Sequence, residues 1–151
     1  MIDLNRKLPI GIQTFEKIRK GNYLYVDKTA LVGKMVSTSI PYFLSRPRRF
    51  GKSLLISTFE AYFKGQKELF EGLAIEKMET EWKKFPVLHL DLNAKKYETP
   101  ADLIAMLNQH LEKWEAIYGT EKQDRQPEER FAYIIERACV QTGKQVVVLV
   151  D

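Results

Sequence analysis

The residues best suited to chemistry are Gly51, Lys52 and Ser53, which follow a basic loop and begin an apolar stretch with helical spacing. A short apolar segment, Pro41 to Leu44, precedes the loop, so the order is strand, loop, Gly-Lys-Ser and helix. The first N–H groups of a helix lack intrahelical partners and carry partial positive charge, so they suit a phosphate. Lys52 would add a cation for the terminal phosphates, and the Ser53 hydroxyl would bind Mg²⁺. The pattern predicts a phosphate-binding loop.

The loop departs from the pattern GxxxxGK[ST] at its first glycine, because Arg46 occupies that position. A glycine there normally permits a tight backbone turn. Pro47 fixes its own φ and favours an extended Arg46, which offers another way to shape the loop. The alternative interpretation is a basic turn before an ordinary amphipathic helix. The strand before the loop and the helix after it favour phosphate binding.

The last six residues, Val146 to Asp151, form an apolar, β-branched run that ends in a carboxylate. Such a run is typical of a buried parallel strand with an acid at its carboxyl end. We interpret Asp151 as the Walker B residue, which would complete a Mg²⁺ site with Ser53. A core strand that happens to end in aspartate is the alternative.

Two short helices are expected before the loop. The first has Thr14 as its N-cap and ends at Gly21. The second begins after Asp27, which can cap it. The apolar residues that this second helix should bury are Leu31, Val32 and Met35. Because the helix directly precedes the strand of the loop, Asp27 could also lie beside a nucleotide base, a role compatible with capping.

Helices and strands alternate after the loop. The loop's own helix should run from Lys52 to about Lys64, followed by a short helix over Glu68 to Ile75. The next strand, Pro86 to Leu92, carries Asp91 and Asn93 at its carboxyl end, where open α/β sheets bind ligands. Two longer helices, 99–118 and 127–142, precede the last strand. This alternation predicts an α/β fold with a parallel sheet covered on both faces.

Composition indicates one soluble domain of 151 residues, 44% apolar and 29% charged. The net charge is +4. Four cations gather around the loop, where a triphosphate would bind, so the charge does not require nucleic acid. They are Arg46, Arg48, Arg49 and Lys52.

A single cysteine, Cys139, excludes an internal disulfide and fits a reducing cytoplasm. It falls on the apolar face of the helix expected over 127–142, so we expect it in the core. No apolar stretch approaches 18 residues, and the amino terminus MIDLNRKLPIG lacks the apolar region of a signal peptide. We therefore expect a cytoplasmic protein with no membrane span.

The sequence resembles the bacterial, predicted AAA-ATPase-like family in four stretches: LPIGIQTFEKIRKGNYLYVDKTALV, RPRRFGKSLL, PVLHLDLN and VVVLVD. The resemblance covers essentially the whole chain, and RPRRFGKS is its most specific part. Archaeal and STAND-type ATPases have the similar loop GPRRVGKT, with glycine where this chain has Arg46. The resemblance implies a three-layer P-loop NTPase fold of the additional-strand type that binds ATP and Mg²⁺.

The resemblance also implies a role for individual residues. Those expected to contact the nucleotide are Arg46, Pro47, Arg49, Phe50, Gly51, Lys52, Ser53 and Leu54 in the Walker A loop, with Tyr25 and Asp27 near the adenine. Those expected to act in catalysis are Lys52, Arg48 and Arg49. Ser53 and Asp151 are the expected ligands of Mg²⁺.

The resemblance further implies that the chain is the N-terminal part of one ATPase domain. We expect lead-in helices in 1–40, the strand, loop and helix in 41–64, and the second and Walker B strands in 86–151. In similar proteins a glutamate after the Walker B aspartate activates water, and a nuclease-like domain, through which nucleic acid could bind, often follows. In those similar proteins, a strand that comes later in the chain also lies between the loop strand and the Walker B strand. Without that strand the sheet would be incomplete at its C-terminus, with open edges that favour homo-oligomers.

The leading functional hypothesis is ATP binding, with Mg²⁺-dependent ATP hydrolysis in the full-length protein. The rival is a non-catalytic protein- or nucleic-acid-binding module whose RPRR loop contacts phosphodiesters. A small-molecule kinase is a third reading that shares the loop. Competition between ATP and nucleic acid separates the first two hypotheses.

Overall fold

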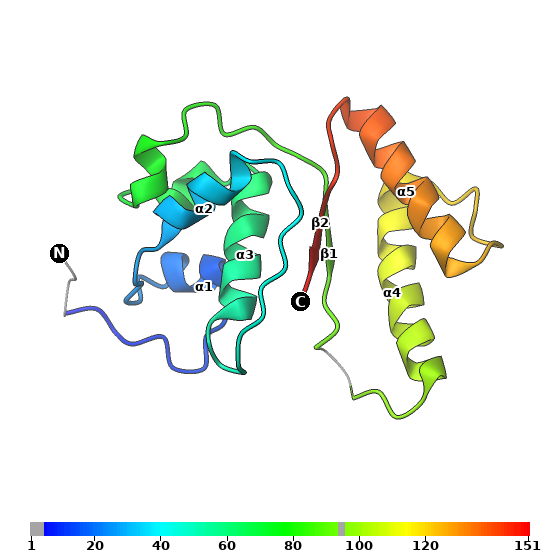
Figure 1. Cartoon of the computed structure of the whole chain (residues 1–151), viewed down its shortest axis with the longest axis horizontal. Coiled ribbons are helices and arrows are strands. Elements are labelled where there is room, and N and C mark those ends of the chain that lie inside the picture. The colour runs from blue at the N-terminus through cyan, green and yellow to red at the C-terminus, as the bar shows by residue number, and fades with distance from the viewer. Residues whose placement is uncertain (1–4, 94–95) are drawn as a thin grey trace. The chain divides into compact units, whose positions relative to one another are not determined.

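The structure, a computed structural model, describes residues 5–93 and 96–151, so the first four residues of the expected lead-in segment lie outside it. The chain forms two compact units, Met1–Lys84 and Phe85–Asp151. Within the described ranges, no helix combines the length and the apolar character that a membrane crossing requires. Figure 1 labels the helices and strands of both units.

The first unit is helical. Its elements are α1 (Phe15–Lys20), α2 (Thr29–Val36), α3 (Lys52–Phe63) and two 3₁₀ turns, η1 (Lys67–Phe70) and η2 (Ala74–Lys77). The three α-helices lie where the sequence predicts them. The single short helix expected over Glu68 to Ile75 is instead two turns, because Gly72 between them has a φ of +75° that ends a right-handed helix.

An aromatic cluster forms the core of the first unit. Phe15 and Phe70 are fully buried with ring centroids 4.8 Å apart. Ile18 of α1 and Ile75 of η2 are buried as well. These contacts come from residues distant in sequence, so the lead-in helices pack on the segments that follow the loop.

One expected core residue of α2 is exposed. Thr29 and Val32 are buried, but 57% of Leu31 is exposed, so that prediction was wrong. Gly33 explains the difference, because a Cβ there would lie 3.0 Å from the Met78 side chain. Because Gly33 has no side chain, η2 and Met78 can approach the face of α2 that carries Gly33. Leu31 lies two positions away on the helix and therefore on a different face.

The segment before the loop is not a paired strand. Residues 40–44 form no helix or strand and make no backbone hydrogen bond to another described residue. A strand needs a ladder partner for its N–H and C=O groups, and the described part of its own unit offers none. The prediction of a strand over Pro41 to Leu44 was therefore wrong for this structure.

The second unit contains the parallel pair predicted from the sequence. β1 (Val87–Leu90) pairs with β2 (Val147–Val150) in the register Val87↔Val147 to Leu90↔Val150. Two helices, α4 (Pro100–Tyr118) and α5 (Pro127–Thr142), lie on one side of this sheet (Figure 1). Among the residues that the structure describes, the sheet has two strands. This confirms the α/β class and the parallel pairing.

The core of the second unit joins the sheet to both helices. Leu88 is fully buried among Leu111, Trp114 and Ile134. α4 begins as expected with Thr99 and Pro100, and Thr99 forms a capping box with Asp102. α5 ends at Gly143, which has a φ of +65°.

Cys139 was expected in that core, but it is exposed. Ile134 and Ala138 form the buried stripe of α5 at a spacing of four residues. Cys139, one position further, is rotated about 100° away from that stripe.

Candidate functional site

The loop before α3 contains two residues with positive φ, Arg49 and Gly51. Gly51, the N-cap of α3, has φ +76° and ψ +21°, and Lys52 begins the helix. Arg49 also has a positive φ, +66°, whereas Arg46 does not. Left-handed residues next to right-handed ones turn successive N–H groups into a concavity that binds anions. Because the left-handed positions are 49 and 51, the loop does not require a glycine at position 46.

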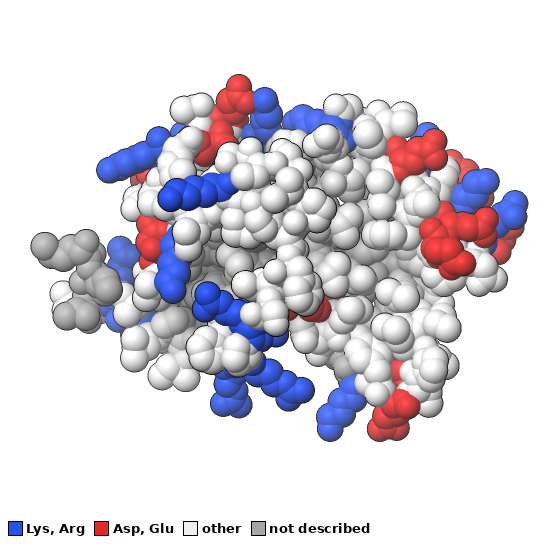
Figure 2. Space-filling model, in the orientation of Figure 1, with Lys and Arg blue, Asp and Glu red and all other residues white. Residues whose placement is uncertain are grey.

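The cations around the loop have no acidic partner among the residues that the structure describes. Arg46, Arg48 and Arg49 are exposed, and none of them forms an ion pair with another described residue. Lys52, half-buried, also has no such partner. The sequence contains no acidic residue between Asp27 and Glu60. The loop lies at the lower end of α3 in Figure 1, and Figure 2, in the same orientation, shows blue side chains projecting there. A polyanion would therefore be attracted to this loop.

A hydrogen bond from α1 helps to hold α3 in place. The Phe15 N–H donates to Ser57 Oγ at 2.9 Å, and Ser57 Oγ–H donates to the Leu54 carbonyl at 2.9 Å. Thr14, the predicted N-cap of α1, makes no side-chain capping bond. Ser57 accepts the N–H of the first helical residue, one of the donors that a helix start leaves without an intrahelical partner. Ser57 lies about 7.5 Å along the helix axis from Lys52. The start of α1 is thus anchored close to the loop.

Asp27 holds α2 and η2 together. Its Oδ1 accepts hydrogen bonds from Thr29 N–H at 2.8 Å and Thr29 Oγ1–H at 2.6 Å, and its Oδ2 accepts one from Ala74 N–H at 2.7 Å. Burial alone would raise the pKa of Asp27, but these hydrogen bonds together outweigh it and lower that pKa. The N-cap of α2 is Lys28, one residue after the predicted Asp27, so Asp27 accepts the N–H of the first helical residue from just outside the cap. A contact between Asp27 and a nucleotide base stays a prediction.

Tyr25 packs into the same unit. Its ring meets the ring of Phe15 edge-on, with centroids 5.2 Å apart. Burial is the main cause that raises the pKa of the Tyr25 hydroxyl, so this group is neutral at physiological pH. Tyr25 therefore has a place in the aromatic core, and its expected contact with adenine stays a prediction.

Asp151 and Asp91 lie side by side at the carboxyl edge of the second unit's sheet. The Asp151 N–H donates to the Leu90 carbonyl at 3.0 Å, and the Leu92 N–H donates to the Asp151 carbonyl at 2.9 Å. In a parallel ladder this pattern makes Asp91 the partner of Asp151, with both side chains on the same face. Asp91 Oδ1 accepts the Asn93 N–H at 2.8 Å.

Carboxylate oxygens at this edge are of the type that Mg²⁺ prefers. Across residues 5–93 and 96–151, however, no three His, Cys, Asp or Glu side chains form a group able to hold a metal ion. A metal at Asp151 would need further oxygen ligands, such as phosphate oxygens and water.

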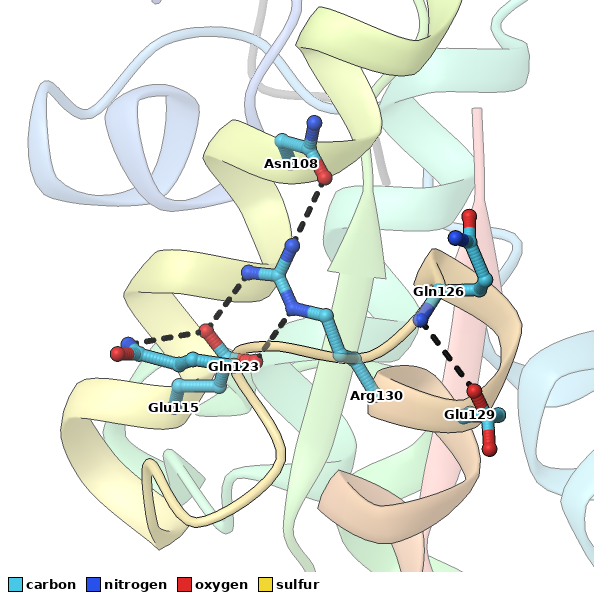
Figure 3. A network of polar contacts seen from close by, with 6 residues as sticks. All are labelled: Asn108, Glu115, Gln123, Gln126, Glu129 and Arg130. Atoms are coloured by element: carbon cyan, nitrogen blue, oxygen red, sulfur yellow. Dashed lines mark hydrogen bonds and ion pairs between the residues drawn. The ribbon is translucent and has the colours of Figure 1, made fainter.

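A buried polar network in the second unit was not anticipated from the sequence. Arg130 Nε and a terminal nitrogen donate to Glu115 at 2.7 and 2.8 Å, and its other terminal nitrogen donates to Asn108 Oδ1 at 2.9 Å (Figure 3). Gln123 also donates to Glu115, at 3.3 Å. The hydrogen bond from Arg130 is the main cause of a lowered pKa at Glu115. Because Arg130 comes from α5 and Glu115 from α4, the network joins the two helices.

A signal for this network was present in the sequence. Arg130 lies four residues before Ile134 and eight before Ala138, so it continues the buried stripe of α5. Glu115 lies four residues after Leu111 on the stripe of α4. Opposite charges on the apolar stripes of two helices indicate an internal ion pair.

Comparison with known proteins places this geometry in context. The model of the family described as predicted AAA-ATPase matches residues 9–151. An uncharacterized protein from the vnfD 5′ region of Azotobacter chroococcum mcd 1 is 40% identical over 147 residues. That match covers 97% of this chain but 28% of the relative, so the chain spans little more than a quarter of the relative's length. No solved structure matches the chain.

Proposed function

The chain belongs to the predicted AAA-ATPase family, and from that membership we propose that it binds ATP, with the phosphates at the N-terminus of α3. The observation that carries the proposal is the loop itself: Gly51 is left-handed, α3 starts at Lys52, and the surrounding cations have no acidic partner among the described residues. A helix N-terminus with a free lysine is suited to a triphosphate. Family membership supports nucleotide binding in general, and the preference for ATP is part of the proposal.

The proposal assigns roles to the residues of the loop. Backbone N–H groups of residues 49–53 and the Lys52 ammonium hold the β and γ phosphates. Arg46, Pro47, Phe50 and Leu54 line the same loop, and Arg48 and Arg49 supply charge that would stabilise the transition state of hydrolysis. Tyr25 and Asp27 are proposed neighbours of the adenine, although both side chains also have structural contacts.

Ser53 is the proposed protein ligand of Mg²⁺ at the loop, from its residue type and its position in the first turn of α3. The role of Asp151, at the end of β2 in the other unit, stays a prediction from the sequence. Mg²⁺ normally keeps phosphate oxygens and water among its ligands, which agrees with the small number of protein ligands here. We also propose the three-layer P-loop fold of the additional-strand type for the complete domain, and ATP hydrolysis for longer members of the family.

Thermal unfolding with and without ATP tests the proposal. ATP at about 100 times its dissociation constant should stabilise the native state by about 2.7 kcal/mol, and Lys52→Ala should abolish that gain. Lys34→Ala is the matched control, because Lys34 is an exposed lysine of the same unit, outside the loop. Unchanged stabilisation in Lys52→Ala would overturn the phosphate assignment.

The Mg²⁺ assignment is tested with Ser53→Ala. ATP affinity without Mg²⁺ should stay unchanged in this variant, while the gain in affinity on adding Mg²⁺ should be lost. An equal loss of affinity with and without Mg²⁺ would show that the hydroxyl acts in another way. Measuring ATP affinity with and without Mg²⁺ therefore distinguishes the loss of a metal ligand from the loss of phosphate binding.

A second candidate is supported by exposed aromatic side chains beside the arginines. Tyr42, Phe43 and Phe50 are exposed and flank Arg46, Arg48 and Arg49 in the sequence. Aromatic and arginine side chains together can bind single-stranded nucleic acid. That candidate predicts binding to an oligonucleotide with a steep salt dependence, unaffected by ATP. Competition by ATP would favour the nucleotide site.

A further inference from the structure

Three hydrogen bonds in series connect α1 to the loop before α3. The series begins at the Phe15 N–H, which donates to Ser57 Oγ at 2.9 Å. The Ser57 Oγ–H donates in turn to the Leu54 carbonyl at 2.9 Å. The peptide group of this carbonyl also contains the Leu55 N–H, which donates to the Gly51 carbonyl at 2.9 Å. Each acceptor thus belongs to the group that makes the next donation, and all three bonds point toward the loop.

The series ends at the first N–H group of α3. The Gly51 carbonyl and the Lys52 N–H form one peptide group, and Lys52 is the first residue of the helix. Such an N–H group has no acceptor within its own helix, and it is one of the groups proposed to hold the phosphates. Hydrogen bonds in series polarise one another, so a donor on the Gly51 carbonyl makes the Lys52 N–H a stronger donor.

Ser57 is the side chain on which this series depends. Thr58 Oγ1–H also donates to the Leu54 carbonyl, at 2.8 Å, as helical hydroxyls often do to the preceding turn. Ser57 differs because its oxygen also accepts an N–H from a residue 42 positions away, in another helix. That bond fixes the hydroxyl so that its proton points to Leu54. Phe15 is fully buried, so the core of the first unit holds the far end of the series in place.

We propose that Ser57 is a positioning residue for phosphate binding: through its hydroxyl, the docked α1 orients and polarises the Lys52 N–H and so raises the affinity of the loop for ATP. This inference rests on the proposed ATP site. Ser57 acts through the peptide groups between it and the loop and does not itself contact the nucleotide. Because a coupling between two events is reciprocal, ATP at the loop strengthens the bond between Phe15 and Ser57.

Calorimetric titration with ATP measures the effect on affinity. Ser57→Ala should weaken ATP binding about three- to tenfold, which corresponds to the loss of one net hydrogen bond. Ser57→Thr keeps a hydroxyl at this position and should restore most of the affinity. Ser37→Ala is the matched control, because it removes an exposed hydroxyl that donates to the Lys34 carbonyl at 2.8 Å, at the end of α2. If Ser57→Ala binds ATP as tightly as Ser37→Ala does, the proposal is wrong.

Amide NMR spectra distinguish a failure of this inference from a failure of the proposed function. Without ligand, Ser57→Ala should shift the Lys52 amide proton resonance and speed exchange of the Leu55 N–H, whereas Ser57→Thr and Ser37→Ala should change neither. Unchanged Lys52 and Leu55 signals in Ser57→Ala would overturn the inference whether or not ATP binds.

ATP should also slow exchange of the Phe15 N–H in the unsubstituted chain and in Ser57→Thr, but not in Ser57→Ala. A role of Ser57 in stability alone would not produce this difference. If the ligand-free signals change as expected but the unsubstituted chain binds no ATP, the series of hydrogen bonds is supported and the proposed function is overturned.

Discussion

At the scale of single residues, the pair Glu115 and Arg130 shows how a buried charge is maintained. The two side chains are almost fully buried, and two hydrogen bonds of 2.7 and 2.8 Å join them. Asn108 and Gln123 occupy further polar atoms of the pair. Since both charges are desolvated, the pair adds little net stability, but the loss of one member leaves the other unpaired. We infer that the network fixes the pairing of α4 with α5.

Glu115→Ala should therefore be far more damaging than removal of an exposed acid. We expect a loss of about 3–5 kcal/mol in the free energy of unfolding, because Arg130 is left buried without its carboxylate. Glu112→Ala on the same helix is the control, and its exposed side chain should cost less than about 1 kcal/mol. Urea denaturation measures both values. Equal effects of the two substitutions would show that the buried pair has no special importance.

At the scale of elements, the loop and α3 show what sequence patterns can and cannot predict. Gly51, Lys52 and the apolar spacing after them predict the start of the helix correctly, because these signals are local. The strand over Pro41 to Leu44 was predicted from apolar residues alone, but a strand also requires a partner that no local pattern reveals. The exposed Leu31 and Cys139 likewise depend on which neighbouring element covers a helix face.

The same contrast applies to the candidate site. The carboxyl-edge position of Asp91 was predictable from the alternation of helices and strands, and its pairing with Asp151 follows from the observed register. The bond from Phe15 to Ser57 was not predictable, since it joins residues 42 apart in the chain. Sequence alone therefore indicates which residues can bind phosphate, but not what holds their helix in place.

Two glycines provide a matched test of the loop. Gly51 and Gly72 have φ values of +76° and +75°, and a Cβ at either would meet no atom within 4 Å. Alanine at either position should cost about 1–2 kcal/mol of stability through the left-handed backbone alone. Only Gly51→Ala should also reduce the thermal stabilisation by ATP, because it disturbs the N-terminus of α3. The same ATP response in both variants would contradict a phosphate site at this loop.

At the scale of the whole molecule, the candidate functional residues that the structure describes belong to two different units. The first unit contains the loop and all four cations around it, and the second contains the sheet edge with Asp91 and Asp151. Each unit has its own core, one aromatic and one built on Leu88. A ligand held mainly by the loop should therefore affect the first unit most.

Hydrogen exchange can locate that effect. ATP without Mg²⁺ should slow exchange of the N–H groups in residues 49–57, at the loop and the start of α3, where the phosphates are proposed to bind. Exchange in α4 and α5 should change little. Protection confined to those two helices would place the nucleotide on the second unit and contradict the proposed site.

The long-range bonds of the first unit also bear on how the protein is made. Thr29 Oγ1 accepts the Ile75 N–H at 3.1 Å across 46 residues of sequence, and Asp27 binds Ala74 across 47. At translation rates of about 5–20 residues per second, roughly 2–9 s separate the synthesis of the two partners. During that interval the segment that covers the apolar faces of α1 and α2 in the folded protein has not yet been made. These faces include Phe15 and Ile18. Native docking of α2 on η2 must therefore wait until translation has reached Ile75, so the first unit completes its fold only when nearly all of it has been synthesised.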